Sequence, residues 1–248
     1  MSLVLYERKD RIAYITMNRP EKRNALNAAL FQELQDAWVR FRDDSDAWVA
    51  VITGAGQAFS VGLDLQEVAR GERLDLPKCS AICQNVWKPT IAAINGWAIA
   101  AGWYIALECD IRIASADAQM ALREVEWGLP SPGVDSLPRH VSLGLALELL
   151  FTANPLGAQR AYEMGLVNQV VPPDQLMPTA TAMAERICEN APLAIRATKQ
   201  LVYKSLWPAL HEMQDLAASI MAIARESEDI REGPKAFAEK RKPRFKGK

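Results

Sequence analysis

Short apolar, β-branched segments recur along this chain between stretches with helical spacing, and this alternation constrains the fold more than any other feature. Residues 11–18 (RIAYITMN) alternate between apolar and polar side chains, and residues 48–54 (WVAVITG) form an apolar run that ends on glycine. Both patterns are typical of strands. Between them, residues 27–44 show helical spacing behind Asn27, a residue type that caps helices. Related segments follow at 88–96, 110–116, 146–152, 158–165 and 167–172. The pattern predicts an α/β fold with a sheet buried on both faces.

The strand signal stops near Met177, and the rest of the chain has a different character. Three helical stretches follow, at residues 179–190, 192–206 and 211–229. We therefore expect an α/β core over residues 1–176 and a helical region over residues 177–248. Because the helical region is small for an independent domain, we expect it to pack on the core or on another subunit.

The charge and hydropathy of the chain argue against two classes of partner. With 29 basic and 30 acidic residues the net charge is −1, so no chain-wide field attracts nucleic acid or an anionic membrane. The longest apolar run, residues 97–107, is well short of the ~20 residues that a membrane helix needs. The first ten residues lack the basic-then-apolar order of a signal peptide. We expect a cytoplasmic protein with no nucleic-acid or membrane partner.

The cysteines and histidines give no metal-binding pattern. Cys79, Cys83, Cys109 and Cys188 contain no C-x-x-C pair, and only two histidines accompany them. A zinc or iron site is therefore not expected, and the thiols are interpreted as small buried side chains in a reducing compartment.

Residues 54–65 (GAGQAFSVGLDL) form the first candidate site segment, directly after an expected strand. Glycine allows a ligand to approach the backbone closely, and the amides of Val61, Gly62 and Leu63 could face a polar oxygen. A dinucleotide-binding G-x-G-x-x-G motif would require glycine at position 59, where the chain has Phe59. A phosphate-binding P-loop would require a Lys-Ser or Lys-Thr pair after Gly62, which is also missing. A plain turn is the remaining alternative.

Residues 95–110 (NGWAIAAGWYIALECD) form the second segment. If a helix begins near its small residues, the unpaired amides at the helix start favour a developing negative charge. Ala100, Ala101 and Gly102 would let a ligand approach that backbone. A tightly packed core helix explains the same composition.

The third segment, residues 120–139, contains Glu124 among apolar residues before a Gly-Leu-Pro-Ser-Pro-Gly turn. Such a setting can desolvate a carboxylate and raise its pKa into the range useful for proton transfer. If the chain is extended here, Glu126 shares a face with Glu124, while Arg123 and Trp127 lie on the other. We interpret Glu126 as a surface acid, since glutamates are mostly exposed.

Taken in order, these segments resemble the crotonase superfamily, the enoyl-CoA hydratase and isomerase group. The residues that carry the resemblance are 15–27, 58–65, 88–115, 122–129, 165–172 and 232–247, and they span nearly the whole chain. The resemblance implies a crotonase-like spiral of ββα units followed by a C-terminal helical trimerisation region. It also implies a homotrimer or a hexamer built as a dimer of trimers, and an acyl-CoA thioester substrate bound without a metal or redox cofactor.

Position by position, the resemblance assigns an oxyanion hole to the amides of Val61 and Ala101. Two preset donors of this kind are worth roughly 3 to 4 kcal/mol each to a developing enolate oxygen. It assigns the coenzyme A groove to Lys22, Arg23, Ala25, Gly62, Leu63 and Asp64. Of these, we expect Asp64 to brace its loop.

The chain departs from the resemblance at one catalytic position. Hydratases of this family use two glutamates; Glu124 matches one, and Tyr104 occupies the place of the other. A phenol with a pKa near 10 is a poor general base at neutral pH, although it can donate a hydrogen bond or orient a substrate. Asp135, in a turn that differs from the family's usual Pro-Gly-x-Gly-Gly, is a candidate second acid.

Several activities stay open at this level. Isomerases of the family use a lone glutamate, as do hydroxycinnamoyl-CoA hydratase-lyases, although the latter rely on a C-terminal tyrosine for which residues 211–227 offer no match. A diketone hydrolase acting without coenzyme A would use histidines, and His140 is a weak candidate. A non-catalytic acyl-CoA binder is the alternative from outside enzymology. We expect an enolate-forming enzyme in which Glu124 transfers the proton.

Overall fold

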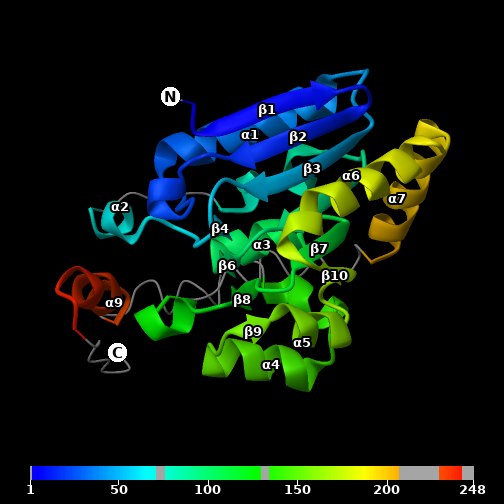
Figure 1. The fold of residues 1–248 in the computed structure, drawn as a ribbon. Helices are drawn as coiled ribbons and strands as arrows, with labels where there is room; N and C mark the ends of the chain where they lie inside the picture. The colour runs from blue at the N-terminus through cyan, green and yellow to red at the C-terminus, as the bar shows by residue number, and fades with distance from the viewer. Residues whose placement is uncertain (1, 71–75, 130–133, 207–228, 242–248) are drawn as a thin grey trace.

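The computed structural model describes residues 2–70, 76–129, 134–206 and 229–241. Its strands form two sheets (Figure 1). The larger sheet has the order β1-β2-β3-β5-β7-β10, made of Val4–Lys9, Ile12–Met17, Val49–Gly54, Thr90–Ile94, Ile111–Ser115 and Gln169–Val171. Only the β1–β2 pair in this sheet is antiparallel. The smaller sheet has the order β4-β6-β8-β9, made of Ala58–Ser60, Trp97–Ile99, Gln119–Ala121 and Leu156–Gly157.

The two sheets are built from a repeating unit. The chain passes from β3 to β4, from β5 to β6 and from β7 to β8, each time leaving the larger sheet for the smaller one. After β4 and β6 a short helix follows, α2 (Leu65–Ala69) and α3 (Ala101–Leu107) respectively. The predicted α/β spiral of strand, strand and helix is therefore confirmed.

Alternating side chains of the larger sheet enter two separate cores, as its expected burial on both faces requires. Val49 and Val51 of β3 pack with α6 (Leu176–Cys188), whereas Ala50 and Ile52 of the same strand pack on the opposite side. That opposite core includes α1 (Ala28–Asp43) and α3. The helix α1 begins as predicted, because the Asn27 side chain accepts a 2.9 Å hydrogen bond from the Leu30 amide.

The remaining helices lie between β8 and β10 or after β10. They are α4 (Leu143–Thr152), α5 (Ala158–Glu163), α7 (Pro192–Leu206) and α9 (Asp229–Ala238). Short 3₁₀ helices are η1 (Pro20–Lys22), η2 (Leu76–Cys79), η3 (Ile82–Gln84), η4 (Glu124–Trp127), η5 (Val134–Arg139) and η6 (Pro173–Gln175). The predicted helix at 211–229 lies outside the described residues except for Asp229. No helix within the described ranges combines the length and apolar content needed to cross a bilayer.

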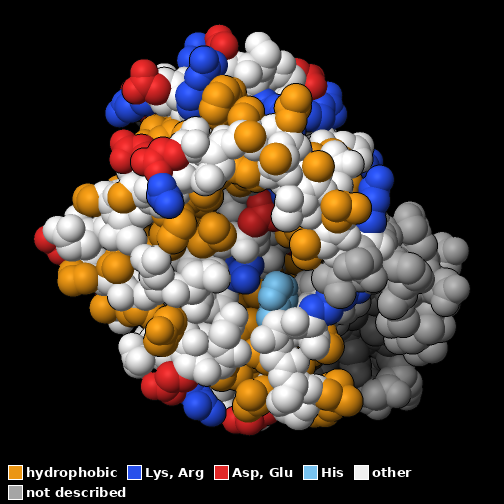
Figure 2. All heavy atoms as spheres, turned by 90° about the vertical axis from the view of Figure 1, so that its right-hand side faces the viewer, with side chains coloured by type: hydrophobic (Ala, Val, Ile, Leu, Met, Phe, Trp, Pro, Cys, Tyr) orange, Lys and Arg blue, Asp and Glu red, His pale blue; other side chains and the backbone are white. Residues whose placement is uncertain are grey.

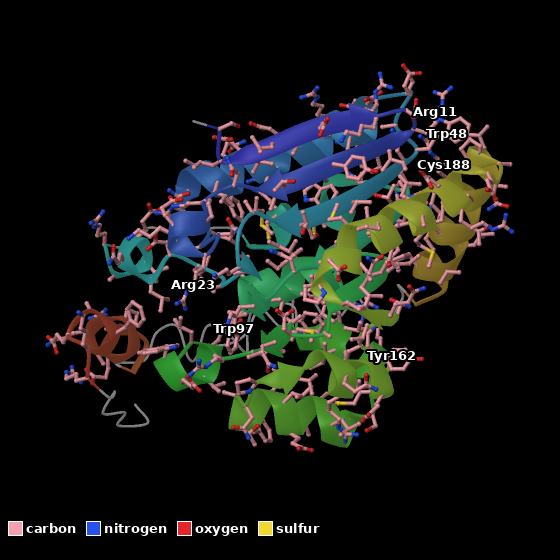
Figure 3. All side chains as sticks on the ribbon, in the orientation of Figure 1. Arg11, Arg23, Trp48, Trp97, Tyr162 and Cys188 are labelled. Atoms are coloured by element: carbon pink, nitrogen blue, oxygen red, sulfur yellow. The ribbon has the colours of Figure 1, made fainter. Side chains whose placement is uncertain are left out.

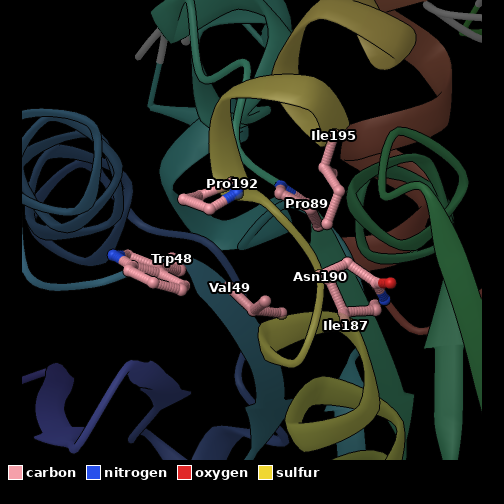
Figure 4. A pocket seen from close by; sticks show the side chains of 7 residues that line it. All are labelled: Trp48, Val49, Pro89, Ile187, Asn190, Pro192 and Ile195. Carbon is pink, nitrogen blue, oxygen red and sulfur yellow. The ribbon is translucent and has the colours of Figure 1, made fainter.

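A small cleft lies at the elbow between α6 and α7 (Figure 4). Ile187, Pro192 and Ile195 line it from the elbow, and Trp48, Val49 and Pro89 line it from the core. None of these residues belongs to a candidate site segment, so the cleft belongs to the packing of the helical region on the sheet.

A buried ion pair anchors α7 to the core. Lys199 Nζ lies 2.8 Å from Asp110 Oδ2 and donates to the Lys88 carbonyl at 3.0 Å. The Tyr203 hydroxyl donates to Asp110 Oδ1 at 2.9 Å, and the Thr90 amide donates to Asp110 Oδ2 at 2.8 Å. Asp110 therefore joins α7 to β5, because its carboxylate accepts hydrogen bonds from both.

Replacing Lys199 with Ala should lower the free energy of unfolding by about 3 kcal/mol, because it leaves a mostly buried carboxylate without its cation. Lys204→Ala, at an exposed position on the same helix, is the matched control and should change it little. Urea denaturation of both variants measures the difference. Equal losses in the two variants would contradict the anchoring role of the ion pair.

Lys88 is a second buried lysine, and its pKa makes stability depend on pH. Its Nζ donates to the carbonyls of Phe41 and Asp44 at 2.7 and 2.5 Å, at the C-terminal end of α1. Burial lowers the pKa of Lys88 from 10.5 to about 8, assisted by Arg196 and opposed by Asp44 and Asp43. Between these two values the unfolded chain binds more protons at this position than the folded chain.

The free energy of unfolding of the wild type should therefore rise relative to that of Lys88→Met as pH increases from 8 to 10.5. Taking the difference in the free energy of unfolding between the wild type and Lys88→Met cancels the contribution of other titrating groups. Denaturation midpoints at several pH values in this window measure it, and a flat difference would show that the pKa of Lys88 does not change on folding.

Candidate active site

The segment after β4 and the loop after η1 are joined along their backbones. The Leu26 amide donates to the Gly62 carbonyl at 2.7 Å, and the Asp64 amide donates to the Leu26 carbonyl at 2.9 Å. Leu26 and Leu63 form a parallel bridge. Two of the segments predicted to line the coenzyme A groove, residues 22–25 and 62–64, thus lie side by side. Lys22 and Arg23 are exposed, and Ala25 is buried.

Asn24 supports this junction, although no motif in the sequence singles it out. Its side chain donates to the carbonyls of Ala55 and Ala58 at 2.9 and 2.7 Å and accepts from the Arg19 amide at 2.9 Å. Its own carbonyl accepts from the Ser60 hydroxyl at 2.8 Å. Asn24 has a φ of 55°, a left-handed conformation that asparagine tolerates better than most residues. The sequence signal that could have indicated this role is an asparagine in a short polar loop.

Asp64 has the bracing position that we predicted for it. One carboxylate oxygen lies 2.8 Å from Arg19 Nη1, and the other accepts from the Gln66 amide at 3.1 Å, which caps α2. Partial burial tends to raise the pKa of Asp64, but the hydrogen bonds from Arg19 and Gln66 outweigh it and lower the pKa. Arg19 also donates to the Ala25 carbonyl at 3.0 Å, so the ion pair links both groove segments.

The start of α3 lies against the same segment. A Cβ on Gly62, where φ is +84°, would lie 3.3 Å from the Ala101 nitrogen and 2.9 Å from the Ile99 carbonyl oxygen. A Cβ on Gly102 would overlap the Ser60 carbonyl oxygen. Glycine is required at both positions for this approach. We call the contact between residues 60–62 and 99–102 the backbone seam. Val61 and Ala101, the residues predicted to supply an oxyanion hole, both belong to it.

The helix of the second segment begins later than its composition suggests. Trp97, Ala98 and Ile99 form strand β6 between β4 and β8, and α3 starts at Ala101. Ala100 separates the two elements with a φ of 53°, and its amide donates to the Ala121 carbonyl at 2.8 Å. Pairing on both sides of β6 outweighs the local helical pattern. As the first helical residue, Ala101 has no acceptor for its amide within α3.

The Val61 amide has an acceptor in this structure. It donates to the Arg23 carbonyl at 3.2 Å, a long hydrogen bond, and Arg23 is in the left-handed conformation with a φ of 50°. A ligand oxygen at Val61 would have to share or replace that carbonyl. The loop that contains Arg23 and the backbone seam are therefore linked through the Val61 amide.

Tyr104 is buried in the helix α3, with 7% of its surface exposed. Burial raises the pKa of its hydroxyl far above the ordinary value, and Glu108, Cys83 and Cys79 add to the effect. The hydroxyl is hydrogen-bonded to the Ser80 side chain. Tyr104 therefore remains a neutral phenol at any physiological pH, directed at the η2–η3 segment.

Glu124 is the first residue of η4 and has 9% of its surface exposed. Glu124 lies three residues after Ala121, whose carbonyl accepts the hydrogen bond from the Ala100 amide. The chain is helical here, not extended, so Glu126 turns away and pairs with Arg123 at 2.7 Å. Glu124 is thus the buried acid of the third segment and Glu126 the partly exposed one. The side chain of Asp135, the candidate second acid, lies outside the described residues.

His140 lies near the opposite end of α3 from Ala101. Burial lowers the pKa of His140 to about 4, with Arg112 and Arg139 contributing. Arg112 donates to the carbonyls of Leu107 and Cys109, at the C-terminal end of α3. Figure 2 shows acidic, basic and histidine side chains gathered in a hollow on this side of the molecule. Because His140 and the seam lie at different ends of α3, the structure gives the diketone hydrolase no support.

The comparisons with known proteins agree with this architecture. The family model described as enoyl-CoA hydratase/isomerase matches residues 7–248. The chain belongs to this family. It is 37% identical to an (E)-benzylidenesuccinyl-CoA hydratase of Thauera aromatica over 98% of the chain and 99% of that protein. It is 34% identical to a short-chain-enoyl-CoA hydratase of Clostridium acetobutylicum, covering 96% of the chain and 95% of that protein.

Solved structures of the family share the fold. A carnitinyl-CoA hydratase from Mycobacterium avium superposes with a TM-score of 0.91 at 37% identity, over the full length of both chains. A monofunctional enoyl-CoA isomerase from M. smegmatis superposes with a TM-score of 0.72 at 32% identity, over 83% of this chain and 94% of that one. The predicted resemblance to the crotonase superfamily is therefore confirmed. The family comprises both hydratases and isomerases, so membership leaves the reaction open.

The backbone seam in this family member should not tolerate a side chain at Gly102. Gly102→Ala should lower the free energy of unfolding by about 2 kcal/mol or more, because the new methyl group must displace the Ser60 backbone. Gly144→Ala is the matched control: a Cβ on Gly144 in α4 meets nothing within 4 Å, and alanine favours a helix by up to about 1 kcal/mol. Thermal and urea denaturation measure both. A neutral Gly102→Ala would mean that the seam is not tight.

Proposed function

We propose that this protein is an acyl-CoA enzyme that adds water to, or removes it from, an enoyl-CoA through a thioester enolate. The observation that supports the proposal is the backbone seam, the close contact between residues 60–62 and 99–102 in a chain of this family. In the proposal, the amides of Val61 and Ala101 bind the thioester oxygen. No separate cofactor is needed, because the coenzyme A thioester is the substrate.

The amides of the seam would act electrostatically. When the α-proton leaves, negative charge moves onto the thioester oxygen, and fixed N–H donors stabilise that charge without having to reorient. Ala101 would supply an amide without an acceptor in its helix. Val61 would exchange its 3.2 Å hydrogen bond with Arg23 for one with the substrate oxygen.

Glu124 is proposed as the proton-transfer residue, acting alone. A single carboxylate can take the α-proton from a 3-hydroxyacyl-CoA, leaving the enolate. The carboxylic acid then returns the proton to the departing hydroxyl group as the carbon–oxygen bond breaks, and water is released. Addition of water is the same path reversed. The burial of Glu124 supports this role, because a buried acid can exchange a proton with a bound substrate while most bulk water is excluded.

Tyr104 is proposed to position the acyl group and not to act as a base. A buried phenol with a raised pKa cannot take a proton from water at neutral pH, but it keeps a fixed hydrogen-bond geometry. Its replacement of the second acid also supports a second candidate function. Migration of a double bond needs one acid and no water, so isomerisation of a 3-enoyl-CoA fits the same residues.

The coenzyme A groove is proposed to run over the two joined segments. Lys22 and Arg23 are exposed at its edge, where cations can meet phosphate groups. Ala25, Gly62 and Leu63 would form the wall, and Asp64 would hold it through Arg19. Figure 3 places Arg23 and Trp97 on the side of the molecule where α2 and α9 lie, which is the side proposed for coenzyme A.

Assembly as a homotrimer, or as a hexamer of two trimers, is proposed from the family. Large apolar side chains support an oligomer: Leu143 and Phe151 on α4 are exposed, as are Leu193 and Leu201 on α7. Such exposed apolar groups on two helices are typical of surfaces that contact other subunits.

The test is turnover in D2O of a small panel of 2-enoyl-, 3-enoyl- and 3-hydroxyacyl-CoA thioesters, followed by mass spectrometry. Glu124→Gln should lower the rate by roughly 10²- to 10⁴-fold, the usual contribution of a general acid–base group. Tyr104→Phe, which keeps the ring and removes the hydroxyl group, should stay within about tenfold of the wild type.

The products separate the alternatives. Addition or loss of water supports the proposed hydratase, and migration of the double bond with deuterium uptake supports the isomerase. A loss in Tyr104→Phe as large as that in Glu124→Gln would contradict the single-acid mechanism. A wild type that binds coenzyme A thioesters without converting any of them would point to the non-catalytic binder.

A further inference from the structure

The C-terminal helix α9 lies directly on η4, the element that begins with Glu124 (Figure 1). A Cβ on Gly233 would overlap the carbonyl oxygen of Trp127, the last residue of η4. The obstacle is backbone, which cannot rotate away as a side chain can. Glycine inside a helix lowers helix stability by about 1 kcal/mol relative to alanine, so its presence here fits a need for close approach.

A ring contact extends the same interface. Trp127 and Phe237 meet edge to face, with ring centroids 5.0 Å apart and planes at 85°. Gly233, Pro234 and Ala236 of α9 are buried. Arg241 Nη1 lies 2.5 Å from Glu232 Oε1, which ties the residues beyond the helix back to its start.

The same helix also touches α2 on its other side. The helix α2 is capped by Asp64, the last residue of the proposed groove segment. The helix α9 therefore contacts two elements that are separate in sequence. One, η4, starts with the proposed acid, and the other, α2, follows the groove segment 62–64.

The 3₁₀ helix η4 is held locally by short-range hydrogen bonds, among them one from the Gly128 amide to the Val125 carbonyl at 3.2 Å. The Leu129 amide donates to the Glu124 carbonyl at 3.1 Å, and the Glu126 amide donates to the Arg123 carbonyl at 3.2 Å. A turn of this length does not hold its position by local bonding alone, since 3₁₀ hydrogen bonds have poor geometry. Its distance from the seam depends on what packs against it.

We propose that α9 is a latch that fixes η4, and with it Glu124, relative to α2 and the seam, and that Trp127, Gly233 and Phe237 are positioning residues. The part of this inference that concerns Glu124 as an acid rests on the proposed function. The mechanical part, that α9 holds η4, does not. A displacement of about 1 Å in a reacting group can lower a rate by about 100-fold, so even a slight shift of η4 would be measurable.

The first experiment is hydrogen–deuterium exchange of the free protein, followed on peptides that cover residues 123–129. Phe237→Ala removes the ring contact, and Gly233→Val separates the two backbones. Both should speed exchange at η4 by about tenfold or more relative to the wild type. Tyr162→Ala is the matched control: Tyr162 lies on α5 and is 50% exposed, against 40% for Phe237. It should leave η4 exchange unchanged. Phe237→Tyr, which keeps the ring, should restore the wild-type rate.

The second experiment uses turnover of whichever thioester the wild type converts. Phe237→Ala should lower kcat about tenfold or more while the Kd for coenzyme A, measured by calorimetry, stays within about twofold. The Arg19–Asp64 ion pair, which includes no residue of α9, should keep the groove in place in this variant. Phe237→Tyr should again restore kcat.

The two experiments test the two parts of the inference separately. Unchanged exchange at η4 in both Phe237→Ala and Gly233→Val would overturn the latch. Faster exchange with an unchanged kcat would overturn the positioning of Glu124 and leave only a structural contact. A wild type that converts no thioester would overturn the proposed function, while the exchange experiment would still decide whether α9 holds η4.

Discussion

The close contact between two backbone segments at Gly62 and Gly102 is the constraint on which the rest of this site depends. Two main chains can approach this closely only where side chains are absent, and a Cβ at Gly102 would overlap the Ser60 carbonyl oxygen. The parallel pairing of β4 and β6 delivers both segments to the same place. Gly62 and Gly102 are thus explained by contact between backbones, whatever ligand binds there.

Buried polar groups outside the seam keep its two halves in place. Asn24 ties the groove loop to the turn before β4, and the Arg19–Asp64 ion pair ties that loop to the cap of α2. Further away, Asp110 connects α7 to β5 through Lys199 and Thr90. Asn24, Arg19, Asp64 and Asp110 each also form a hydrogen bond with a backbone amide or carbonyl. Such groups are retained because an unsatisfied buried polar atom is costly.

Tyr104 is the residue that most affects the reaction that we propose for this chain. Its hydroxyl is held by Ser80 and is kept neutral by burial. The matched relatives carry names of both hydratases and an isomerase, and the fold is common to them. Fold membership therefore narrows the substrate class, while the reaction depends on which acids face the substrate. With Tyr104 neutral, the buried Glu124 is the group that we propose to move the proton.

The sequence alone determined the fold class, the burial of the larger sheet on both faces, the cap of α1 at Asn27 and the start of α7 at Pro192. These features depend on local periodicity and on residue preferences, which a single sequence contains. It also indicated the glycine-rich segments and the order of motifs that the family comparison confirmed.

Tertiary structure decided the rest. Pairing with β4 and β8 turned residues 97–99 into a strand, and the helical turn at η4 separated Glu126 from Glu124. The hydrogen bonds of Asn24 to Ala55 and Ala58, and the contact of Gly233 with Trp127, join residues that are distant along the chain. Such contacts depend on where whole elements pack, and no local pattern in the sequence encodes that.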